Sequence, residues 1–466
     1  MKSIIISSNC SGGGKSTFTL ALMKALIDRG FDVQGYKVGP DYIDTAFHTH
    51  LCKKASRNLD LFMMGEEGVK ISFSRGRGDI GIIEGVMGLY DGLGYDSKYS
   101  TYHLSQVLNI PIILVITPKA QSNTLCAELS GLLNYENANI IGVVLNNVSE
   151  SYYQLLKKMV EKNTPLKVMG YMPSDERIIL GSRHLGLIQS SEIEDLDKKI
   201  SIASKLLEEH VDMKEIINCL EETERHDSKD ANDQAEHFKR LISDRNESIK
   251  AAYAYDKAFS FYYKENLELL ETVGELIPFS PLKDKRLPEG IDFLYIGGGY
   301  PEIFEEELSG NKELLNDIRE KLENGLPAYA ECGGLMYLTK GSEKNNMVGF
   351  FDGIYKMSDS LVNFGYAELH VSGENHIFDR GLKVNCHEFH KSYVELTEPT
   401  VFSLSKNYYE QENHWQCGYI KNNVVASYVH IHFYGNMKFF NSLIKLAYMN
   451  KIKYSYNKKI AETQVR

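Results

Sequence analysis

Short apolar runs alternate along the chain with stretches whose apolar residues recur every three or four positions. The first such pair is the run 4–7 (Ile-Ile-Ile-Ser) and the stretch 18–26, whose spacing is helical. Further apolar runs cover 80–83, 111–116 and 140–145. Short apolar runs that alternate with helices are typical of parallel strands, so the first half is expected to form a doubly wound, mostly parallel α/β sheet.

The pattern repeats in the second half after a break. The segments 249–254 and 293–296 predict buried strands. The composition changes over residues 221–248, of which 221–230 are nearly all polar or charged, so this stretch is expected to be an exposed linker. We therefore expect two doubly wound α/β domains. Their predicted bounds are a first domain at 1–222, a polar linker at 223–247, a second domain at 248–450 and a polar tail at 451–466.

Composition restricts the class of protein. At 466 residues the chain is long enough for two or three domains, and a net charge of −11 argues against a nucleic-acid partner. Its seven cysteines show no metal-ligand spacing, which indicates reduced thiols in a cytoplasmic protein. The start of the chain leads directly into a strand, so no signal peptide is expected, and no apolar run is long enough for a membrane span. The sequence leaves a monomer and a homodimer open.

A glycine-rich loop connects the first strand to the first helix. Glycines such as Gly12 and Gly14 let backbone N–H groups surround phosphate oxygens, and Lys15 then neutralises the phosphates while Ser16 binds Mg²⁺. The strict P-loop pattern has glycine where this chain has Asn9, a residue that tolerates left-handed backbone angles. A phosphate-binding loop for ATP and Mg²⁺ is the prediction, and a glycine-rich turn without nucleotide is the alternative.

Polar residues follow the neighbouring strands of this predicted sheet. Lys37 lies in a predicted strand at 32–38, and Asp41 and Asp44 follow it. Ligands bind at the carboxyl ends of such strands, although a solvated turn is the alternative. Glu84 ends the run 80–83, where P-loop proteins carry an acidic group for Mg²⁺. The metal site is therefore predicted at Ser16, Glu84 and Asp41.

Two asparagines follow the run 140–145. Asn146 and Asn147 stand at the same edge of the sheet as the predicted phosphate loop. We interpret one of them as a contact to the nucleotide base.

A second chemical centre is predicted around Cys332. The segment 326–336 reads as a strand, a sharp turn at the cysteine and the start of a helix. Such an elbow exposes a thiol beside a helix dipole, which is expected to lower its pKa and make it a nucleophile; a core cysteine is the alternative. Backbone N–H groups near Gly298, Gly299 and Gly333 are the candidates for an oxyanion hole.

A nucleophilic thiol needs a base, and two histidines occur late in the chain. His430 and His432 stand two residues apart in an apolar run, a spacing that is expected to place both on one side of a strand. Both are candidate catalytic residues.

Several long blocks resemble one known family. They are Tyr36-Lys37-Val38-Gly39-Pro40-Asp41-Tyr42-Ile43-Asp44, Arg57-Asn58-Leu59-Asp60, Ile83-Glu84-Gly85-Val86-Met87-Gly88-Leu89-Tyr90-Asp91-Gly92 and Gly181-Ser182-Arg183-His184-Leu185-Gly186-Leu187. With these blocks the chain resembles the cobyrinic acid a,c-diamide synthase family over nearly its whole length. That resemblance implies a P-loop synthetase domain related to dethiobiotin synthetase, followed by a class I glutamine amidotransferase domain.

The resemblance also implies roles for residues of the first domain. Lys15, Ser16 and Thr17 would bind phosphate and Mg²⁺, and Glu84 would be a metal ligand. Asp41, Asp44 and Asp91 would belong to the metal and substrate region. Arg183 and His184 are local cations suited to a polycarboxylate macrocycle, with a surface salt bridge as their alternative reading.

In the second domain the resemblance implies Cys332 as the nucleophile of glutamine hydrolysis and His430 as its base. Many class I amidotransferases carry Glu two residues after that His, where this chain has His432, so a Cys-His pair supported by His432 is expected. The segment 385–392 departs from the family at Asn385 and Cys386. It is interpreted as part of the domain interface or of the substrate site, and a metal site at its histidines is an alternative.

The function implied is amidation of the a and c carboxylates of cobyrinic acid, with MgATP as activator and L-glutamine as nitrogen donor. Hydrogenobyrinic acid or nickel sirohydrochlorin as the macrocycle stays open, because the spacing does not distinguish these substrates. A partitioning-type switch ATPase is the alternative from another class. Such an ATPase carries an early second lysine, where this chain has Cys10, and lacks a thiol elbow.

Overall fold

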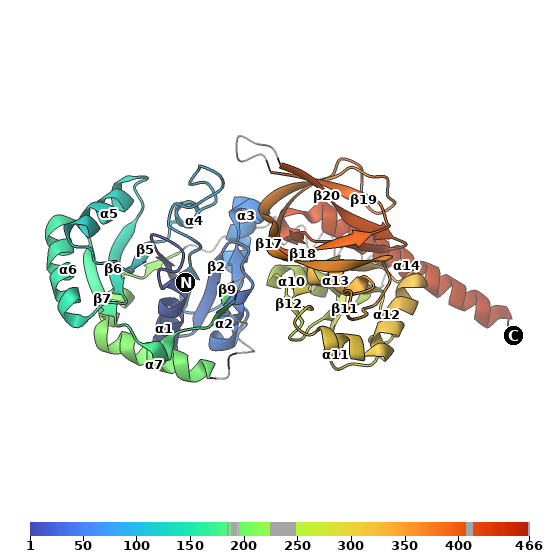
Figure 1. Cartoon of the computed structure of the whole chain (residues 1–466), viewed down its shortest axis with the longest axis horizontal. Helices are drawn as coiled ribbons and strands as arrows, with labels where there is room; N and C mark the ends of the chain where they lie inside the picture. The colour runs from blue at the N-terminus through green and yellow to red at the C-terminus, as the bar shows by residue number, and fades with distance from the viewer. Residues whose placement is uncertain (184–185, 188–192, 194, 224–247, 407–412, 465–466) are drawn as a thin grey trace. The chain divides into compact units, whose positions relative to one another are not determined.

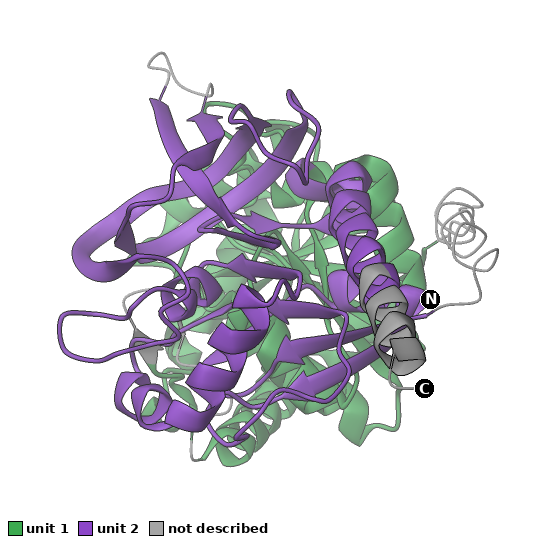
Figure 2. Cartoon of the chain, turned by 90° about the vertical axis from the view of Figure 1, so that its right-hand side faces the viewer, with its two compact units in different colours: residues 1–61, 65–227 green, residues 62–64, 228–466 purple. Residues whose placement is uncertain are grey.

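The computed structural model divides the chain into two compact units. It describes residues 1–466 except 184–185, 188–192, 194, 224–247, 407–412 and 465–466. One unit comprises residues 1–61 and 65–227, and the other comprises 62–64 and 228–466 (Figure 2). Most of the predicted linker at 223–247 lies outside the described residues.

The first unit is built on a sheet in the order β3-β2-β4-β1-β5-β6-β7, whose neighbouring strands are all parallel. A short strand, β10, pairs antiparallel with β1. The strands are β1 (Lys2–Ser7), β2 (Val33–Val38), β3 (Arg57–Leu59), β4 (Ile80–Glu84), β5 (Ile112–Ile116), β6 (Ile140–Asn146), β7 (Lys167–Met172) and β10 (Glu221–Glu222), with a separate hairpin of β8 (Ser182–Arg183) and β9 (Gly186–Leu187).

Helices flank this sheet (Figure 1). They are α1 (Lys15–Asp28), α2 (Ile43–Cys52), α3 (Leu61–Arg75), α4 (Thr101–Leu108), α5 (Asn123–Asn134), α6 (Glu150–Asn163), α7 (Leu196–His210) and α8 (Met213–Asn218), with a 3₁₀ turn, η1 (Glu176–Ile178). α1 contacts α2 and α7, so these three helices share a layer. Because β4 and β5 are buried at every residue, they read as continuous apolar runs in the sequence.

The second unit is built on a ten-stranded sheet in the order β13-β11-β14-β16-β21-β20-β19-β17-β18-β22. From β13 to β21 neighbouring strands are parallel, and from β21 to β22 they are antiparallel. The strands are β11 (Ile249–Ala254), β13 (Gly274–Phe279), β14 (Phe293–Ile296), β16 (Ala328–Glu331), β17 (Gly353–Val371), β18 (Lys383–Leu396), β19 (Thr400–Lys406), β20 (Asn413–Lys421), β21 (Val424–Ser427) and β22 (His430–Ile431), with a separate pair of β12 (Phe259–Phe261) and β15 (Gly298–Gly299).

The helices of this unit are α10 (Lys264–Val273), α11 (Glu305–Gly310), α12 (Lys312–Glu323), α13 (Gly333–Leu338) and α14 (Met437–Gln464), with a 3₁₀ turn, η3 (Phe433–Gly435). Residues 451–464 of the predicted polar tail belong to α14. The predicted α/β class is confirmed. The antiparallel half of this second sheet was not foreseen from the sequence pattern.

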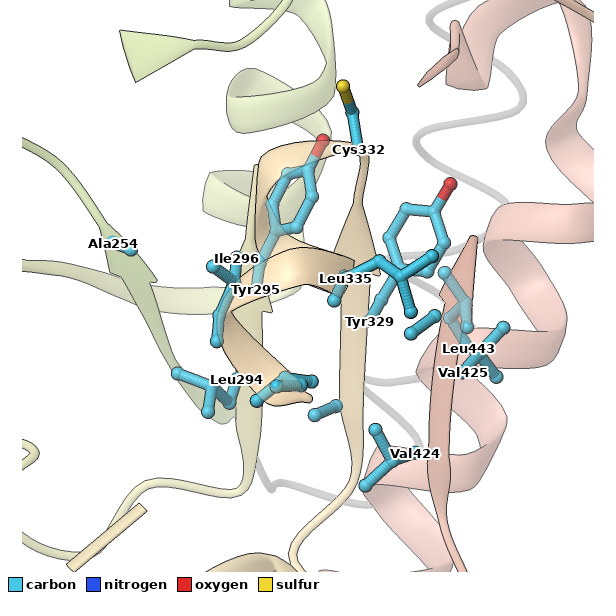
Figure 3. Close-up of a cluster of buried hydrophobic side chains, with 14 of the residues drawn as sticks. Ala254, Leu294, Tyr295, Ile296, Tyr329, Cys332, Leu335, Val424, Val425 and Leu443 are labelled. Atoms are coloured by element: carbon cyan, nitrogen blue, oxygen red, sulfur yellow. The ribbon is translucent and has the colours of Figure 1, made fainter. Parts of the chain in front are cut away.

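The core of the second unit lies beneath the end of β16. Buried side chains of β14, β16 and β21 pack together there with Leu335 and Leu443 (Figure 3). Tyr295 and Tyr329 carry their hydroxyl groups toward the same end of the sheet as the sulfur of Cys332 (Figure 3). The carboxyl ends of the parallel strands therefore bring polar atoms to the edge of an apolar core.

Candidate functional site

The glycine-rich loop lies between β1 and α1, as predicted. Gly14 caps α1 with a left-handed φ of 94°, and a Cβ there would lie 2.2 Å from Nδ2 of Asn146. Only glycine fits this position without strain or collision. The first turn of α1 carries no acidic residue, which leaves its positive dipole end available to an anion.

Lys15 extends from this loop over the backbone. Its Nζ donates to the carbonyl oxygens of Cys10 at 2.9 Å and Met87 at 2.6 Å. Burial, followed by the positive charge of Lys37, lowers the pKa of Lys15 to about 8. A phosphate placed among these groups would favour the charged amine over the neutral one.

A buried ion cluster lies beside the loop. Nζ of Lys37 contacts Oδ2 of Asp44 at 2.5 Å and Oε1 of Glu84 at 3.0 Å. Burial opposes the charge of Lys37, but the two carboxylates outweigh it and raise the pKa of this lysine. Burial also opposes the charge of Glu84, and Lys37 and His48 nevertheless hold the pKa of this carboxyl below its usual range. Burial, then Asp41 and Glu84, raises the pKa of Asp44.

Glu84 connects the loop to this cluster. The hydroxyl of Ser16 donates to Oε1 of Glu84 at 2.6 Å, and Nε2 of His48 lies 2.9 Å from Oε2. His48 was not singled out from the sequence, because it lies inside α2 without a motif around it. The structure thus brings together Ser16 and Glu84, two of the three residues predicted to hold Mg²⁺.

The third predicted ligand, Asp41, has another local role. Its Oδ1 accepts the N–H groups of Ile43 and Asp44 at the start of α2, and its Oδ2 lies 4.0 Å from Nζ of Lys37. Among the described residues, no group of three or more His, Cys, Asp or Glu side chains is arranged to hold a metal. An oxygen pair such as Ser16 and Glu84 suits Mg²⁺, which commonly takes few protein ligands together with substrate phosphates and water.

Three further predicted residues of the first unit are Asn146, Asn147 and Asp91. Asn146 donates to the hydroxyl of Thr117 at 2.9 Å and to the carbonyl of Gly13 at 3.4 Å, so its amide supports the loop. Asn147 is exposed with a left-handed φ of 59°, and its contact to a base stays a prediction. Asp91 accepts the N–H of Gly88 at 2.8 Å.

The two predicted cations for the macrocycle lie at the margin of the described chain. The backbone of Arg183 belongs to β8, whereas His184 lies outside the described residues. Their roles stay predictions.

In the second unit the predicted elbow is present. Cys332 follows β16, caps α13 and has φ 50° and ψ −106°, a conformation that non-glycine residues rarely adopt. Its backbone N–H donates to the carbonyl of Ser427 at 2.8 Å, which connects the turn to the end of β21.

The prediction that the elbow lowers the pKa of this thiol is wrong. Burial raises the pKa of Cys332, and the Glu302 carboxylate raises it further, although the backbone N–H of Gly333 acts in the opposite direction. The hydrogen bond from Gly333 does not outweigh burial beside carboxylates. The thiol is therefore neutral at neutral pH, and a base has to take its proton when it attacks.

The predicted oxyanion glycines lie close to one another. A Cβ on Gly333 would lie 3.2 Å from the backbone N of Gly299, and a Cβ on Gly298 would lie 2.6 Å from Cε1 of His430. A side chain at either glycine would collide with its neighbour. The absence of a side chain therefore lets the backbone at these positions lie close to the elbow. The oxyanion role stays a prediction.

His430 and His432 meet different carboxylates. Nδ1 of His430 lies 3.7 Å from Oε2 of Glu331, and Nε2 of His432 lies 3.5 Å from Oε2 of Glu265. The expectation that one strand presents both on the same side is wrong. β22 covers only His430–Ile431, and His432 already caps η3. Glu331 and Glu265 were not singled out from the sequence, since no motif marks either residue.

The segment that departs from the family also has defined contacts. Nδ2 of Asn385 donates to the carbonyl of Phe62 at 2.8 Å, and Phe62 is one of three residues of the first half that belong to the second unit. Cys386 is buried, and its thiol lies 3.3 Å from the carbonyl of Ala367. Glu388 accepts from His390 at 2.9 Å and from Trp415 at 3.0 Å, so both of its oxygens already have partners.

Among the described residues, no helix combines the length and the apolar character that crossing a membrane requires. Each of the two α/β units carries its own polar groups at the carboxyl ends of its parallel strands.

Each half of the chain matches the model of a known domain family. Residues 4–187 match the CobQ/CobB/MinD/ParA nucleotide binding domain, and residues 250–438 match the CobB/CobQ-like glutamine amidotransferase domain. The predicted pairing of a P-loop domain with an amidotransferase domain is confirmed. The first domain is therefore a nucleotide-binding domain.

The chain is also similar to curated proteins over nearly its whole length. It is 56% identical to a cobyrinate a,c-diamide synthase of Clostridium tetani over 96% of this chain and 100% of that protein. It is 57% identical to one of Clostridium acetobutylicum over the same shares, and 42% identical to one of Caldanaerobacter subterraneus over 92% of this chain and 95% of that protein.

Proposed function

Because the chain belongs to the cobyrinate a,c-diamide synthase family, we propose that it converts the a and c side-chain carboxylates of cobyrinic acid to amides. ATP activates each carboxylate, and L-glutamine supplies the nitrogen. The observation that carries the proposal is the presence of two chemical centres in one chain. These are the phosphate loop with its buried Glu84 cluster and the strained elbow at Cys332.

The first domain makes the carboxylate reactive. The loop N–H groups and Lys15 bind the phosphates of ATP, with Gly12 in the loop and Thr17 in the first turn of α1. Ser16 and Glu84 would hold Mg²⁺, which would neutralise charge as two anions approach each other. A substrate carboxylate oxygen attacks the γ-phosphorus, ADP leaves and an acyl phosphate forms. Ammonia then attacks the carbonyl carbon, a proton is lost and phosphate departs.

Residues around this centre take the supporting roles. Lys37, Asp41 and Asp44 organise the loop beside the phosphates, and Asp91 belongs to the substrate region. Arg183 and His184 bind carboxylates of the macrocycle. The ion cluster supports this assignment, since Lys37 holds two carboxylates in a buried site that a phosphate-bound metal would share.

The second domain releases ammonia from glutamine. His430 takes the thiol proton of Cys332, the sulfur attacks the carboxamide carbon, and the proton passes to the departing ammonia. Water then hydrolyses the thioester to glutamate. His432 supports the Cys332–His430 pair, and N–H groups near Gly298, Gly299 and Gly333 stabilise the oxyanion.

We place this reaction in the cytoplasm, without a nucleic-acid or membrane partner. The net charge of −11 supports the absence of a phosphate-backbone partner. A monomer and a homodimer remain open, and light scattering of the purified chain distinguishes them.

Product mass spectrometry tests the proposal. The enzyme is incubated with glutamine and MgATP and with cobyrinic acid, hydrogenobyrinic acid or nickel sirohydrochlorin in parallel. Two successive amidations of cobyrinic acid alone are expected. Amidation of another macrocycle would keep the mechanism and change the substrate, and ATP hydrolysis without any amidation would contradict the proposal.

A further inference from the structure

Glu331 occupies an unusual position for a carboxylate. It is the last residue of β16, directly before Cys332, and it is only 1% exposed. Three donors meet it in the second unit. The hydroxyl of Tyr329 lies 2.8 Å and the backbone N–H of Ile431 3.2 Å from Oε1, and the hydroxyl of Tyr295 lies 3.1 Å from Oε2.

These donors are fixed in place. Both tyrosines are buried in the core below the elbow, and their hydroxyl ends point the same way (Figure 3). Burial, and after it the charge of Glu331, raises the pKa of each phenol, so both remain neutral donors. A buried carboxylate with three donors has a defined orientation rather than a choice of rotamers.

Glu331 also faces the proposed base. Its Oε2 lies 3.7 Å from Nδ1 of His430, while its Oε1 accepts the N–H of the next residue, Ile431. One carboxylate thus contacts the backbone that carries the imidazole and lies next to the ring nitrogen. A distance slightly beyond hydrogen-bond range is common at such sites before substrate tightens them.

We propose that Glu331 is the positioning carboxylate of the glutaminase centre. It holds the Nδ1–H of His430 and leaves Nε2 to accept the thiol proton of Cys332. This inference rests on the proposed roles of Cys332 and His430. Glu265 faces His432, and Glu388 is held by His390 and Trp415, which leaves Glu331 as the carboxylate beside His430 among these three.

The role has a chemical purpose. When His430 takes the thiol proton, its ring becomes cationic, and a fixed carboxylate at Nδ1 stabilises that state and fixes the tautomer. A negative charge next to Cys332 otherwise opposes ionisation, because Glu331 is one of the carboxylates that raise the pKa of this thiol. If Glu331 positions His430, removing its charge should slow the ionisation of the Cys332 thiol. If Glu331 acts only as a nearby negative charge, removing that charge should favour the thiolate.

The test uses the full chain with Glu331→Gln. Glutamine hydrolysis is expected to lose about 100-fold or more in kcat, with KM changed by less than about threefold, and synthesis from ammonia is expected to continue. The rate of Cys332 alkylation by iodoacetamide, followed on its own peptide by mass spectrometry, is expected to fall. Glu331→Asp should recover part of kcat.

A double variant distinguishes a positioning role of Glu331 from a purely structural one. In a His430→Ala background, Glu331→Gln should cause no further fall in the alkylation rate, because the carboxylate acts through the imidazole. Alkylation that is equal or faster in folded Glu331→Gln would overturn the inference. A further fall in the His430→Ala background would overturn it as well. If His430→Ala itself left glutamine hydrolysis unchanged, the proposed role of His430 would fail instead.

Two matched tyrosine variants keep the test open should Glu331→Gln not fold. Tyr295→Phe removes the donor on Oε2, the oxygen that faces His430, and Tyr329→Phe removes the donor on Oε1. The inference expects the larger loss of glutaminase kcat from Tyr295→Phe. Equal effects, or a larger loss from Tyr329→Phe, would overturn it.

Discussion

Cys332 and Lys37 are both buried, yet their surroundings give them opposite charge states. Carboxylates near Cys332 add to the effect of burial and raise the pKa of the thiol, which keeps it neutral. Carboxylates beside Lys37 outweigh burial and raise the pKa of the amine, which keeps it charged. The thiol therefore needs a base before it reacts, and the lysine stays a cation in the ion cluster beside the glycine-rich loop.

The neutral thiol predicts an alkaline reactivity profile. A raised pKa leaves less thiolate at any given pH, so alkylation of Cys332 should begin to rise at a higher pH than alkylation of N-acetylcysteine. Peptide-resolved alkylation with iodoacetamide, measured across pH without glutamine, checks this. A rise at lower pH than the reference thiol would show that the elbow activates the sulfur by itself.

Lys37→Met should destabilise the first unit by about 3–5 kcal/mol, because it leaves the buried carboxylates of Glu84 and Asp44 without their cation. Hydrogen exchange of the β4 amides measures the change in opening free energy. Lys24→Met is the matched control, since Lys24 pairs with the exposed Asp28 in α1 and should change stability by less than about 1 kcal/mol. Equal effects of the two substitutions would contradict this account of the cluster.

At the scale of elements, the start of α10 holds the segment that follows His430, the candidate base. Nδ2 of Asn266 donates to the carbonyl of Ile431 at 2.8 Å, and its Oδ1 accepts the N–H of Phe433 at 2.8 Å. The segment between β22 and η3 is thereby fixed on both sides of His432. A buried amide side chain replaces the ladder hydrogen bonds that a longer strand would supply.

Asn266→Ala should lower the kcat of glutamine hydrolysis by about 10-fold or more, because two buried backbone groups lose their partners at about 1–3 kcal/mol each. Synthesis from ammonia should be unchanged. Steady-state assays with both nitrogen sources check this. Glu268→Ala, a change elsewhere on α10, is the control. An unchanged glutaminase kcat would show that the segment holds its position without Asn266.

Elements with a strong local signal could be predicted from the sequence, and others could not. The apolar runs within β4 and β14 are continuous because both strands are buried at every residue. β17 mixes buried and exposed residues over 19 positions, so its sequence lacks a clear period. β22 has two residues, too few for any pattern, which is why His430 and His432 were placed on one strand.

The candidate site shows the same limit. Lys15, Glu84 and Cys332 stand in local motifs, so the sequence singled them out as candidates. His48 and Glu331 lie beside Glu84 and His430, which are 36 and 99 positions away in the sequence, and that proximity exists only in the fold. The charge state of Cys332 was mispredicted because burial and the carboxylates around it also come from distant segments.

At the scale of the whole molecule, the chain joins two α/β units that carry separate chemistry. The phosphate loop belongs to residues 1–61 and 65–227, and the thiol elbow belongs to residues 62–64 and 228–466. The matched families divide the chain in the same order. Amidation needs both reactions, so a substitution in one unit should abolish the reaction of that unit and leave the reaction of the other unit.

Lys15→Ala should abolish synthesis from glutamine and from ammonia alike, because neither nitrogen source helps when the carboxylate is not activated. Glutamine hydrolysis should persist at a measurable rate, since Cys332 and His430 lie in the other unit. ADP release and glutamate release, measured in parallel, check this. Synthesis from ammonia at the unsubstituted rate would contradict the role of Lys15.

The most direct test of the two-centre account is Cys332→Ala, assayed for amidated macrocycle with glutamine and then with ammonium as nitrogen source. The account predicts that synthesis from glutamine is lost and that synthesis from ammonium is retained at the unsubstituted rate. Loss of both activities in a folded protein, or retention of the glutamine-driven reaction, would contradict it.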